Sequence, residues 1–379
     1  MKPADRVQQV PPSGIRRFFE LAEQRDEVIS LGVGEPDFPA PWAARDAAIT
    51  SLERGRTSYT ANRGRLELRE AIATHVEDNY DLAYDPEAEI VVTAGASEGI
   101  DLAFRALVNP GDTVAVAQPC YVSYVPGVLF AGGEVLSVPT RRRDAFKLTY
   151  DALDAAGAGE AEMLVLCYPN NPTGATMTGD ELSEVAEFAR EHDLTVLSDE
   201  IYAALSYEHE HTSIATLPGM RERTVVCNGF SKAYAMTGLR LGYVLAPPEI
   251  ATAMNRVHQY TLLSAPTTAQ EAAIEALSSC DDAVAEMRSR YDRRRKLLLS
   301  RFEEMGLDCF RATGAFYAFP ECPREDAGEF AEELLDETGV AVVPGPAFGD
   351  GGEGHLRVSY ATGIDDLKEA LDRIEAFIS

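Results

Sequence analysis

Residues 163–174 read MLVLCYPNNPTG, a short apolar run that ends in a polar, proline-containing turn. Similar runs occur at 194–199 (LTVLSD) and 224–228 (TVVCN), and a helical pattern lies between the first two. Strands that are apolar on both faces are typical of parallel sheets, because helices cover such sheets on both sides. The stretch therefore predicts the middle of a mostly parallel sheet in an α/β protein.

The pattern extends along the chain in both directions. Further strands are predicted at 89–94, 113–118, 134–139 and 239–246, and helices at 41–54, 65–78 and 97–108. Thr178 and Glu181 form a T-x-x-E capping box, which marks the start of another helix. Near the N-terminus, Ser13 is predicted to cap a helix whose apolar face is formed by Ile15, Phe18, Phe19 and Ala22.

The pattern changes at about residue 281. A long charged helix at 281–306 leads to strands at 314–320, 340–344 and 355–361 and to a closing helix at 364–378. We therefore predict an α/β fold in which a mostly parallel sheet is sandwiched by helices, with a smaller α+β domain. The expected parts are an N-terminal segment (1–40) that joins the small domain, a large domain (41–280) and a small C-terminal domain (281–379).

The chain is strongly acidic. It has 62 Asp and Glu residues against 34 Lys and Arg, which gives a net charge of −28. Such a surface repels nucleic acid and anionic membranes, so we expect no nucleic-acid partner and no membrane partner. The acidic excess and the preference for Arg over Lys favour a salt-adapted, halophilic protein, in which ions screen the self-repulsion. An ordinarily acidic enzyme is the alternative.

The cysteines and the N-terminus also exclude some classes of protein. The six cysteines are scattered without a C-x-x-C pair, and several lie in apolar runs, so neither a disulfide framework nor a metal site is predicted. The first residues, MKPADRVQQVPPSG, lack an apolar signal region, and no window reaches the length of a membrane span. We expect a cytoplasmic protein.

Polar side chains follow three of the predicted strands. Asn171 follows the first run, Asp199 ends the second with Tyr202 close behind, and Lys232 follows the third. The carboxyl ends of parallel strands meet at one edge of a sheet, where α/β proteins bind ligands. Only five of the 34 basic residues are Lys. A lysine kept among apolar neighbours suggests chemistry, because burial can deprotonate Lys but not Arg, and a neutral amine is a nucleophile.

The remaining polar groups suggest what such an amine would meet. An amine nucleophile implies a carbonyl partner and a Schiff base. Asp199 could pair with a cationic ring nitrogen, and Arg240 could pair with an anion. The segment TAGASEG (93–99) follows a strand and opens a helix, where free N–H groups favour phosphate. An aldehyde, a basic ring nitrogen and a phosphate together describe pyridoxal 5'-phosphate (PLP).

The motifs NNPTG, SDEIY and SKAYAMTGLRLGY, in this order and spacing, resemble those of the class I/II, fold-type-I PLP-dependent aminotransferases. The resemblance extends through SLGVGEPDF, YTANRGRLELREAIA, GAFYAFP and LRVSYA, so it covers residues 13–379. It implies a transaminase that acts on an amino acid and a 2-oxo acid, with a large domain of PLP fold type I. Within this family, the sequence looks most like the archaeal aromatic and aspartate aminotransferases.

The resemblance also implies roles for individual residues. Lys232 would form the Schiff base and move the substrate α-proton, and Asp199 would keep the pyridine nitrogen protonated. Asn171 and Tyr202 would bind the ring oxygen, and Tyr121 would stack on the ring. The family's phosphate ligands match Ala96, Ser97, Ser231 and Arg240.

Substrate and partner groups follow from the same comparison. Arg357 would bind the substrate α-carboxylate in bidentate fashion, with help from Gly34 and Asn171. Tyr59 would reach the phosphate of a partner subunit, which implies a homodimer with shared active sites. One departure is Gly229, because many members have a phosphate-binding Ser at that position.

Simpler interpretations compete with these roles. Asp199 could cap a turn, Arg357 could face solvent, and Tyr121 and Tyr59 could be packing residues. At the level of function, a PLP-dependent lyase or cyclopropane-forming synthase on the same fold is an alternative. A third is the aminotransferase-like sensor domain of transcription regulators, which the charge and the early start of the enzyme motifs oppose.

For the donor we expect an aromatic L-amino acid, with 2-oxoglutarate as acceptor. Dicarboxylate specialists of the subgroup commonly have Lys where this chain has Ser97, and an unpaired distal carboxylate is costly to bury. An aromatic ring needs only apolar walls, for which the candidates are Ile15, Phe18, Phe19, Phe316 and Tyr317. Aspartate aminotransferase activity is the alternative.

Overall fold

The computed structural model describes residues 2–12, 14, 15, 25 and 27–379. The predicted N-cap Ser13 and the apolar residues Phe18, Phe19 and Ala22 lie outside the described residues, whereas Ile15 is buried. None of the helices in the described part of the chain is long and apolar enough to cross a membrane.

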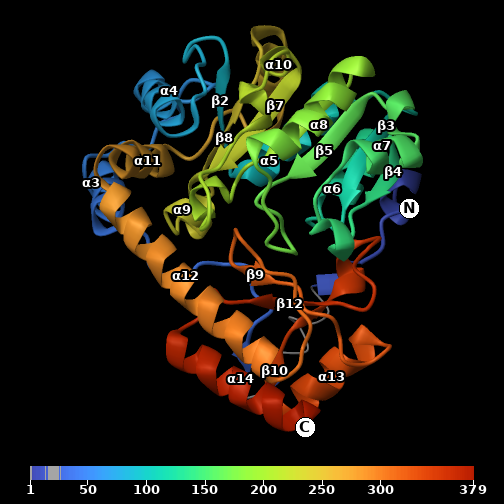
Figure 1. Ribbon diagram of the computed structural model, residues 1–379. Coiled ribbons are helices and arrows are strands. Elements are labelled where there is room, and N and C mark those ends of the chain that lie inside the picture. The colour runs from blue at the N-terminus through green and yellow to red at the C-terminus, as the bar shows by residue number, and fades with distance from the viewer. Residues whose placement is uncertain (1, 13, 16–24, 26) are drawn as a thin grey trace.

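A seven-stranded sheet forms the centre of the molecule, in the order β2-β8-β7-β6-β5-β3-β4 (Figure 1). The strands are β2 (Ile90–Thr93), β3 (Thr113–Gln118), β4 (Glu134–Pro139), β5 (Met163–Cys167), β6 (Thr195–Asp199), β7 (Thr224–Gly229) and β8 (Gly242–Leu245). From β7 to β4 all neighbours are parallel, which confirms the predicted mostly parallel α/β sheet.

β8 is antiparallel to both of its neighbours. Its predecessor, β7, is linked to it by residues 230–241, which hold only the short helix α9 (Phe230–Ala233) and the 3₁₀ turn η6 (Thr237–Leu239). A return to the same end of the sheet normally needs a longer crossover with a full helix, so here the chain reverses direction. The sequence pattern predicted this strand but gave no direction for it.

Alternate side chains of each strand enter the cores on the two faces of the sheet. In β5, Leu164 and Leu166 pack on one face, and Met163, Val165 and Cys167 pack on the other. The first face is covered by α7 (Tyr150–Ala156) and α8 (Gly179–Glu191), and the second by α5 (Ala96–Leu107), α6 (Tyr124–Ala131) and α10 (Pro248–Thr261). The capping box of α8 is present as predicted, since Thr178 and Glu181 each accept the other's backbone N–H.

Three further helices enclose the β2–β8 edge of the sheet. They are α3 (Trp42–Glu53), α4 (Leu66–Tyr80) and α11 (Thr267–Ser279), and their buried side chains form one core with those of β2 and β8. The remaining short 3₁₀ turns are η1 (Arg142–Asp144), η2 (Ala158–Glu160), η3 (Ala203–Leu205), η4 (Ile214–Thr216), η5 (Arg221–Arg223) and η7 (Gly345–Phe348).

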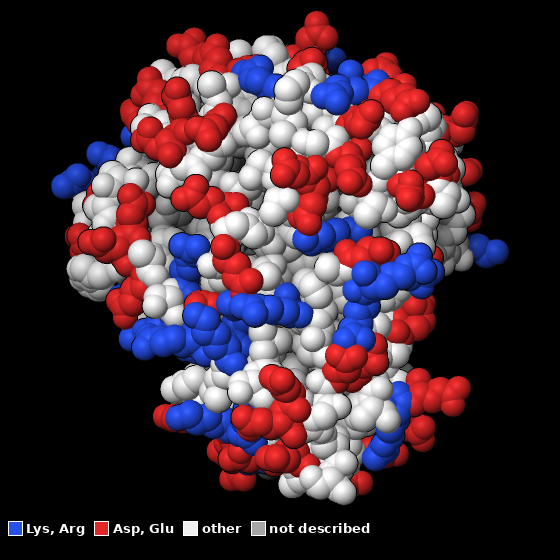
Figure 2. Space-filling view, viewed as in Figure 1, with Lys and Arg blue, Asp and Glu red and all other residues white. Residues whose placement is uncertain are grey.

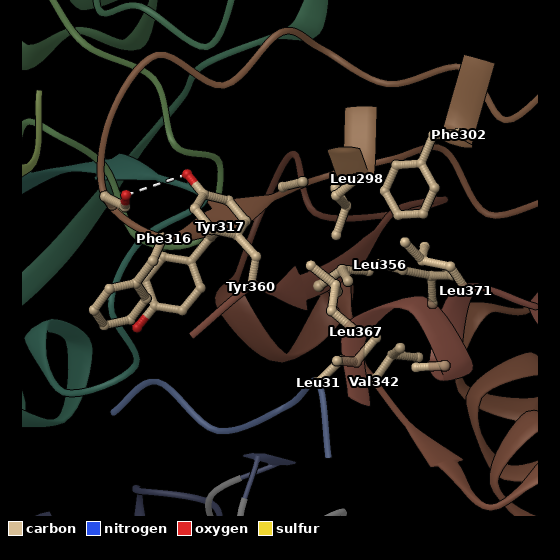
Figure 3. Packing of buried hydrophobic residues seen from close by; sticks show 14 of the residues in the cluster. Leu31, Leu298, Phe302, Phe316, Tyr317, Val342, Leu356, Tyr360, Leu367 and Leu371 are labelled. Atoms are coloured by element: carbon tan, nitrogen blue, oxygen red, sulfur yellow. Dashed lines mark hydrogen bonds between the residues drawn. The ribbon is translucent and has the colours of Figure 1, made fainter. Parts of the chain in front are cut away.

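The C-terminal part forms the lower half of Figure 1. It contains α12 (Asp281–Glu304), α13 (Ala327–Thr338) and α14 (Ile364–Ile378). A three-stranded antiparallel sheet has the order β11 (Val343–Pro344), β12 (Leu356–Ser359), β9 (Tyr317–Ala318). Figure 3 shows the core of this C-terminal part, in which Leu298 and Phe302 of α12 lie near Leu367 and Leu371 of α14.

The strand predicted at 340–344 is divided in two. β10 (Val340–Ala341) pairs in parallel with β1 (Ile29–Ser30), whereas β11 pairs with β12. The chain changes partners at Val342, whose side chain enters the same core (Figure 3). Residues 29–31 therefore lie in the C-terminal part, and the backbone of Leu31 bonds both Ala341 and Ser359.

The earlier part of the N-terminal segment lies elsewhere. α1 (Asp5–Gln8) contacts α6, and Ile15 belongs to the core beneath α7 and α8. The division of the chain at residues 40 and 280 stays a prediction.

Candidate active site

A cavity of about 490 Å³ lies beyond the carboxyl ends of β5, β6 and β7. It brings together most of the predicted site residues, namely Gly34, Ala96, Ser97, Tyr121, Asn171, Asp199, Tyr202, Ser231, Lys232, Arg240 and Arg357. Tyr59 is the exception, because it is 80% exposed and borders a separate hollow with Arg65 and Thr267. Segments that are far apart in the sequence thus meet where the strand ends predicted a site.

Lys232 lies on α9, directly after β7, and its Nζ donates to the carbonyl oxygen of Gly34 at 2.6 Å. The pKa of Lys232 is lowered from 10.5 to about 8, chiefly by burial and also by Arg357 and Arg240, whereas Glu35 and Asp199 act in the opposite direction. The neutral amine is therefore accessible near physiological pH, as a nucleophile or a base requires.

Gly229, the last residue of β7 and three residues before Lys232, packs closely against the neighbouring strand β8. A Cβ at Gly229 would lie 2.7 Å from the Cα of Gly242, its cross-strand partner in β8. A side chain at this position would therefore require β7 and β8 to shift, and Ser231, which is buried, is the hydroxyl of this turn that borders the cavity.

Asp199 is the last residue of β6 and is 3% exposed. Its Oδ2 accepts the hydroxyl of Tyr124 at 2.6 Å, and its Oδ1 accepts the N–H of Ile201 at 3.2 Å. Burial raises the pKa of Asp199 from 3.8 to about 6, although both hydrogen bonds act to lower it. The carboxylate is thus held in a fixed position, at an energetic cost that a cation in the cavity would remove.

Arg357 on β12 is buried, and no carboxylate among the described residues pairs with it. Its guanidinium donates to Asn171 Oδ1 at 3.0 Å and to the Gly32 carbonyl, and lies over the rings of Tyr317 and Phe348. Its Nε has no partner in the described part of the chain. Burial lowers the pKa of Arg357, which indicates a cation that lacks a counter-ion.

The first turn of α5 forms another wall of the cavity. Gly95 precedes it with φ 82°, and a Cβ there would lie 2.6 Å from Nη2 of Arg240. The N–H groups of Ala96 and Ser97 precede the first helical hydrogen bond, and no acceptor takes them within the described residues. Together with Arg240, which forms no ion pair with a described residue, they make an anion site.

Aromatic rings complete the cavity. The hydroxyls of Tyr202 and Tyr317 lie 2.9 Å apart, and Tyr121 packs edge-on against Tyr124. Among the predicted apolar walls, Ile15 and Tyr317 line the cavity, whereas Phe316 packs against the rings of Tyr202 and Tyr317.

The sequence did not reveal several of the participants. They are Tyr124, which bonds Asp199, and the lining residues Glu35, Val122, Cys167 and Thr237. The position of Tyr124, three residues after Tyr121, was the one available signal, because it places both rings on one face of a turn.

Comparisons with known proteins agree with this geometry. A sequence model of the family "Aminotransferase class I and II" matches residues 26–374. The chain belongs to the class I and II aminotransferases. An aromatic-amino-acid aminotransferase of Thermococcus litoralis is 43% identical over 379 residues, covering 98% of this chain and 97% of the relative. An aspartate aminotransferase of Pyrococcus abyssi is 44% identical over 382 residues, covering 99% and 98%.

The solved structures agree as well. An aromatic aminotransferase from Pyrococcus horikoshii has a TM-score of 0.90 and 44% identity, covering 96% of this chain and 98% of that one. The aminotransferase resemblance and the α/β fold inferred from the motifs are therefore confirmed, and the chain is an enzyme that transaminates.

Aminotransferases of this family use PLP, and the residues of this cavity fit it. The free N–H groups of α5 and the unpaired Arg240 suit a phosphate. The buried Asp199 suits a basic ring nitrogen, and the amine of Lys232 suits a carbonyl. Among the described residues no cluster of His, Cys, Asp or Glu side chains is arranged to hold a metal ion.

Proposed function

We propose that this aminotransferase transfers the amino group of an aromatic L-amino acid to a 2-oxo acid such as 2-oxoglutarate. The observation that carries the substrate preference is the set of cations in the cavity. Within the described residues these are Lys232, Arg240 and Arg357, and each has a proposed role other than binding a distal carboxylate. The position that could have supplied another cation, at the start of α5, is Ser97.

Lys232 is proposed as the residue that takes and returns the proton at the substrate Cα. Bound PLP supplies an electron sink for the pair left on that carbon. Asp199 supports the sink by holding a proton on the ring nitrogen, with its own position fixed by Tyr124. Asn171 and Tyr202 would bind the ring oxygen of PLP, and Tyr121 would stack on its ring. The lowered pKa of Lys232 and the burial of Asp199 support these roles.

The cavity is proposed to have two anion sites, one for the cofactor phosphate and one for the substrate α-carboxylate. The first turn of α5, with Ala96 and Ser97, joins Ser231 and Arg240 in binding the cofactor phosphate. Arg357 binds the substrate α-carboxylate, because its guanidinium is buried and lacks a carboxylate partner among the described residues. Asn171, which accepts a hydrogen bond from Arg357, and the backbone of Gly34 help to orient that carboxylate.

The active form is proposed to be a homodimer, in which Tyr59 completes the phosphate site of the partner subunit. The 80% exposure of Tyr59, outside the cavity of its own chain, supports this assignment. The exposed side chains of Tyr260, Leu262 and Leu263 lie close by, since Asn62 donates to the Leu263 carbonyl at 2.7 Å. These apolar groups fit the contact between subunits.

The protein is further proposed to be cytoplasmic and salt-adapted. Figure 2 shows acidic side chains spread over this face of the molecule, with many of the basic ones across its middle and others near its top, sides and lower part. Screening of such a surface requires salt. We expect the melting temperature to rise between low and molar KCl, and an unchanged melting temperature would contradict the salt-adapted assignment.

An aspartate donor is the second candidate for the substrate, since relatives named for aromatic and for aspartate donors are 43% and 44% identical to this chain. The test is to measure kcat/KM for phenylalanine, tyrosine, aspartate and alanine with 2-oxoglutarate in molar KCl. We expect both aromatic donors to exceed aspartate. Aspartate ahead of both by more than about tenfold would overturn the preference. Formation of ammonia in place of glutamate would indicate a lyase.

A further inference from the structure

A pair formed by the buried His258 and the partly buried Glu98 lies behind the first turn of α5. His258 Nδ1 is 2.7 Å from Glu98 Oε1, and the imidazole is fully buried. The other carboxylate oxygen, Oε2, accepts the N–H of Ala94 at 2.5 Å. The pair therefore connects α10, which carries His258, to the turn that precedes α5.

Most backbone polar groups of that turn are hydrogen-bonded, and the N–H groups that face the cavity are the exception. The Thr93 hydroxyl donates to the Gly95 carbonyl at 2.9 Å, and Arg240 donates to the Ala94 carbonyl at 3.5 Å. The Ala94 N–H is taken by Glu98. The N–H groups of Ala96 and Ser97 are left without an acceptor in the described part of the chain, and they border the cavity.

Glu98 is the third residue of α5, a position from which a glutamate side chain can reach back to the N-cap N–H of its own helix, here that of Gly95. A carboxylate drawn back in this way would place its negative charge beside the N–H groups of Ala96 and Ser97, and that charge would repel a phosphate there. The bond to His258 keeps Oε1 on the α10 side of the helix. His258 Nε2 has no partner among the described residues, so this bond is what the buried imidazole provides.

We propose that His258 and Glu98 are positioning residues, which hold the 94–97 turn so that the N–H groups of Ala96 and Ser97 stay available to the phosphate of PLP. The inference rests on the proposed phosphate site. It adds residues that act through the turn and do not touch the cofactor.

The test compares PLP with pyridoxal, which lacks the phosphate. Cofactor-free His258→Phe, which keeps a ring but no donor, and Glu98→Gln should bind PLP about tenfold more weakly or worse than the wild type, the range for losing a hydrogen bond to a charged group. Their pyridoxal affinities should change by less than about twofold, because the ring contacts are unaltered. His258→Asn keeps an N–H at the place of Nδ1 and should retain most of the PLP affinity.

Glu89→Gln is the matched control. Like Glu98, Glu89 accepts the N–H four residues earlier, here that of Asp85. It is buried and pairs with a cation, Arg221, but it lies at the opposite end of β2 from the turn. The control should leave both affinities at the wild-type values. The ratio of the PLP and pyridoxal affinities is unaffected by a variant that is only partly folded, because both ligands sample the same folded fraction.

The wild-type affinities for PLP and pyridoxal distinguish failure of the proposed phosphate site from failure of the positioning role. If wild-type protein binds pyridoxal as tightly as PLP, and inorganic phosphate does not compete with PLP, the proposed phosphate site itself is wrong. If the wild type prefers PLP and is inhibited by phosphate, but His258→Phe and Glu98→Gln keep the same preference, the positioning role is refuted. Equal losses for His258→Phe and His258→Asn would also refute it, since packing would then explain the effect.

Discussion

In the absence of PLP, replacing Asp199 by Asn should stabilise the protein near neutral pH, and the gain should fade in acid. Burial raises the pKa of Asp199 from 3.8 to about 6 in the folded chain. A carboxyl group with a raised pKa binds its proton more readily when folded. It therefore adds stability below pH 3.8, and this contribution is lost as the pH rises through 6.

The expected size follows from the shift. At about 1.36 kcal/mol per pKa unit, a rise of about 2.2 units corresponds to roughly 3 kcal/mol over the full range. About 2 kcal/mol of this falls between pH 4.5 and pH 7.5. Since the amide of Asn does not titrate, the free energy of unfolding of Asp199→Asn should gain about that amount relative to the wild type across this interval.

The assay is urea unfolding of the two cofactor-free proteins in molar KCl at pH 4.5, 6.0 and 7.5. Asp46→Asn, a change at an exposed carboxylate of α3, serves as a control whose difference from the wild type should stay flat. A flat difference for Asp199→Asn, or one that favours the wild type as the pH rises, would refute the reasoning. With PLP bound the sign should reverse, because the carboxylate then faces a cationic ring nitrogen.

Three more predictions concern activity. Lys232→Ala and Lys232→Arg should both lack transamination, since a guanidinium stays protonated; full turnover by either would end the assignment of Lys232. Arg357→Lys should lower kcat/KM about tenfold to a hundredfold for every donor, as expected for losing a charged hydrogen bond, and an unchanged value would contradict the α-carboxylate role. Tyr59→Phe should weaken PLP binding, and mixing it with inactive Lys232→Ala should restore activity beyond either alone, because one site of the mixed dimer is intact. No gain on mixing would exclude shared sites.

The sheet was predictable because its strands are short, apolar and separated by helices. The β3 and β4 strands begin and end at the predicted residues, and β6 differs from the prediction by a single residue. The direction of the strands was not predictable, since nothing in the sequence of β8 indicates that it pairs antiparallel with its neighbours. The division at Val342 arises in the same way, from a change of pairing partner that is settled only when the chain is folded.

The site was predictable where chemistry lies at strand ends, as for Asn171, Asp199 and Lys232. It was not predictable where a partner comes from a distant element. Tyr124 bonds Asp199 across 75 positions, and His258 bonds Glu98 across 160. Neither residue stands out in the sequence, because a tyrosine or histidine on an amphipathic helix is ordinary packing until its neighbour is known.

Unlike the chain as a whole, the lining of the cavity has more cations than carboxylates, since only Glu35 and Asp199 oppose three basic side chains among the described residues. Acidic residues outnumber basic ones by 62 to 34, yet the three cations that line the cavity, Lys232, Arg240 and Arg357, form no ion pair with any described residue. A buried cation such as Arg357 is costly without a counter-ion, and the chain has enough carboxylates to supply one. Leaving the cavity cationic keeps these charges for anionic ligands, the phosphate and the substrate carboxylate. Ligands that complete these ion pairs bind the folded state alone, so cofactor and substrate should both stabilise the fold.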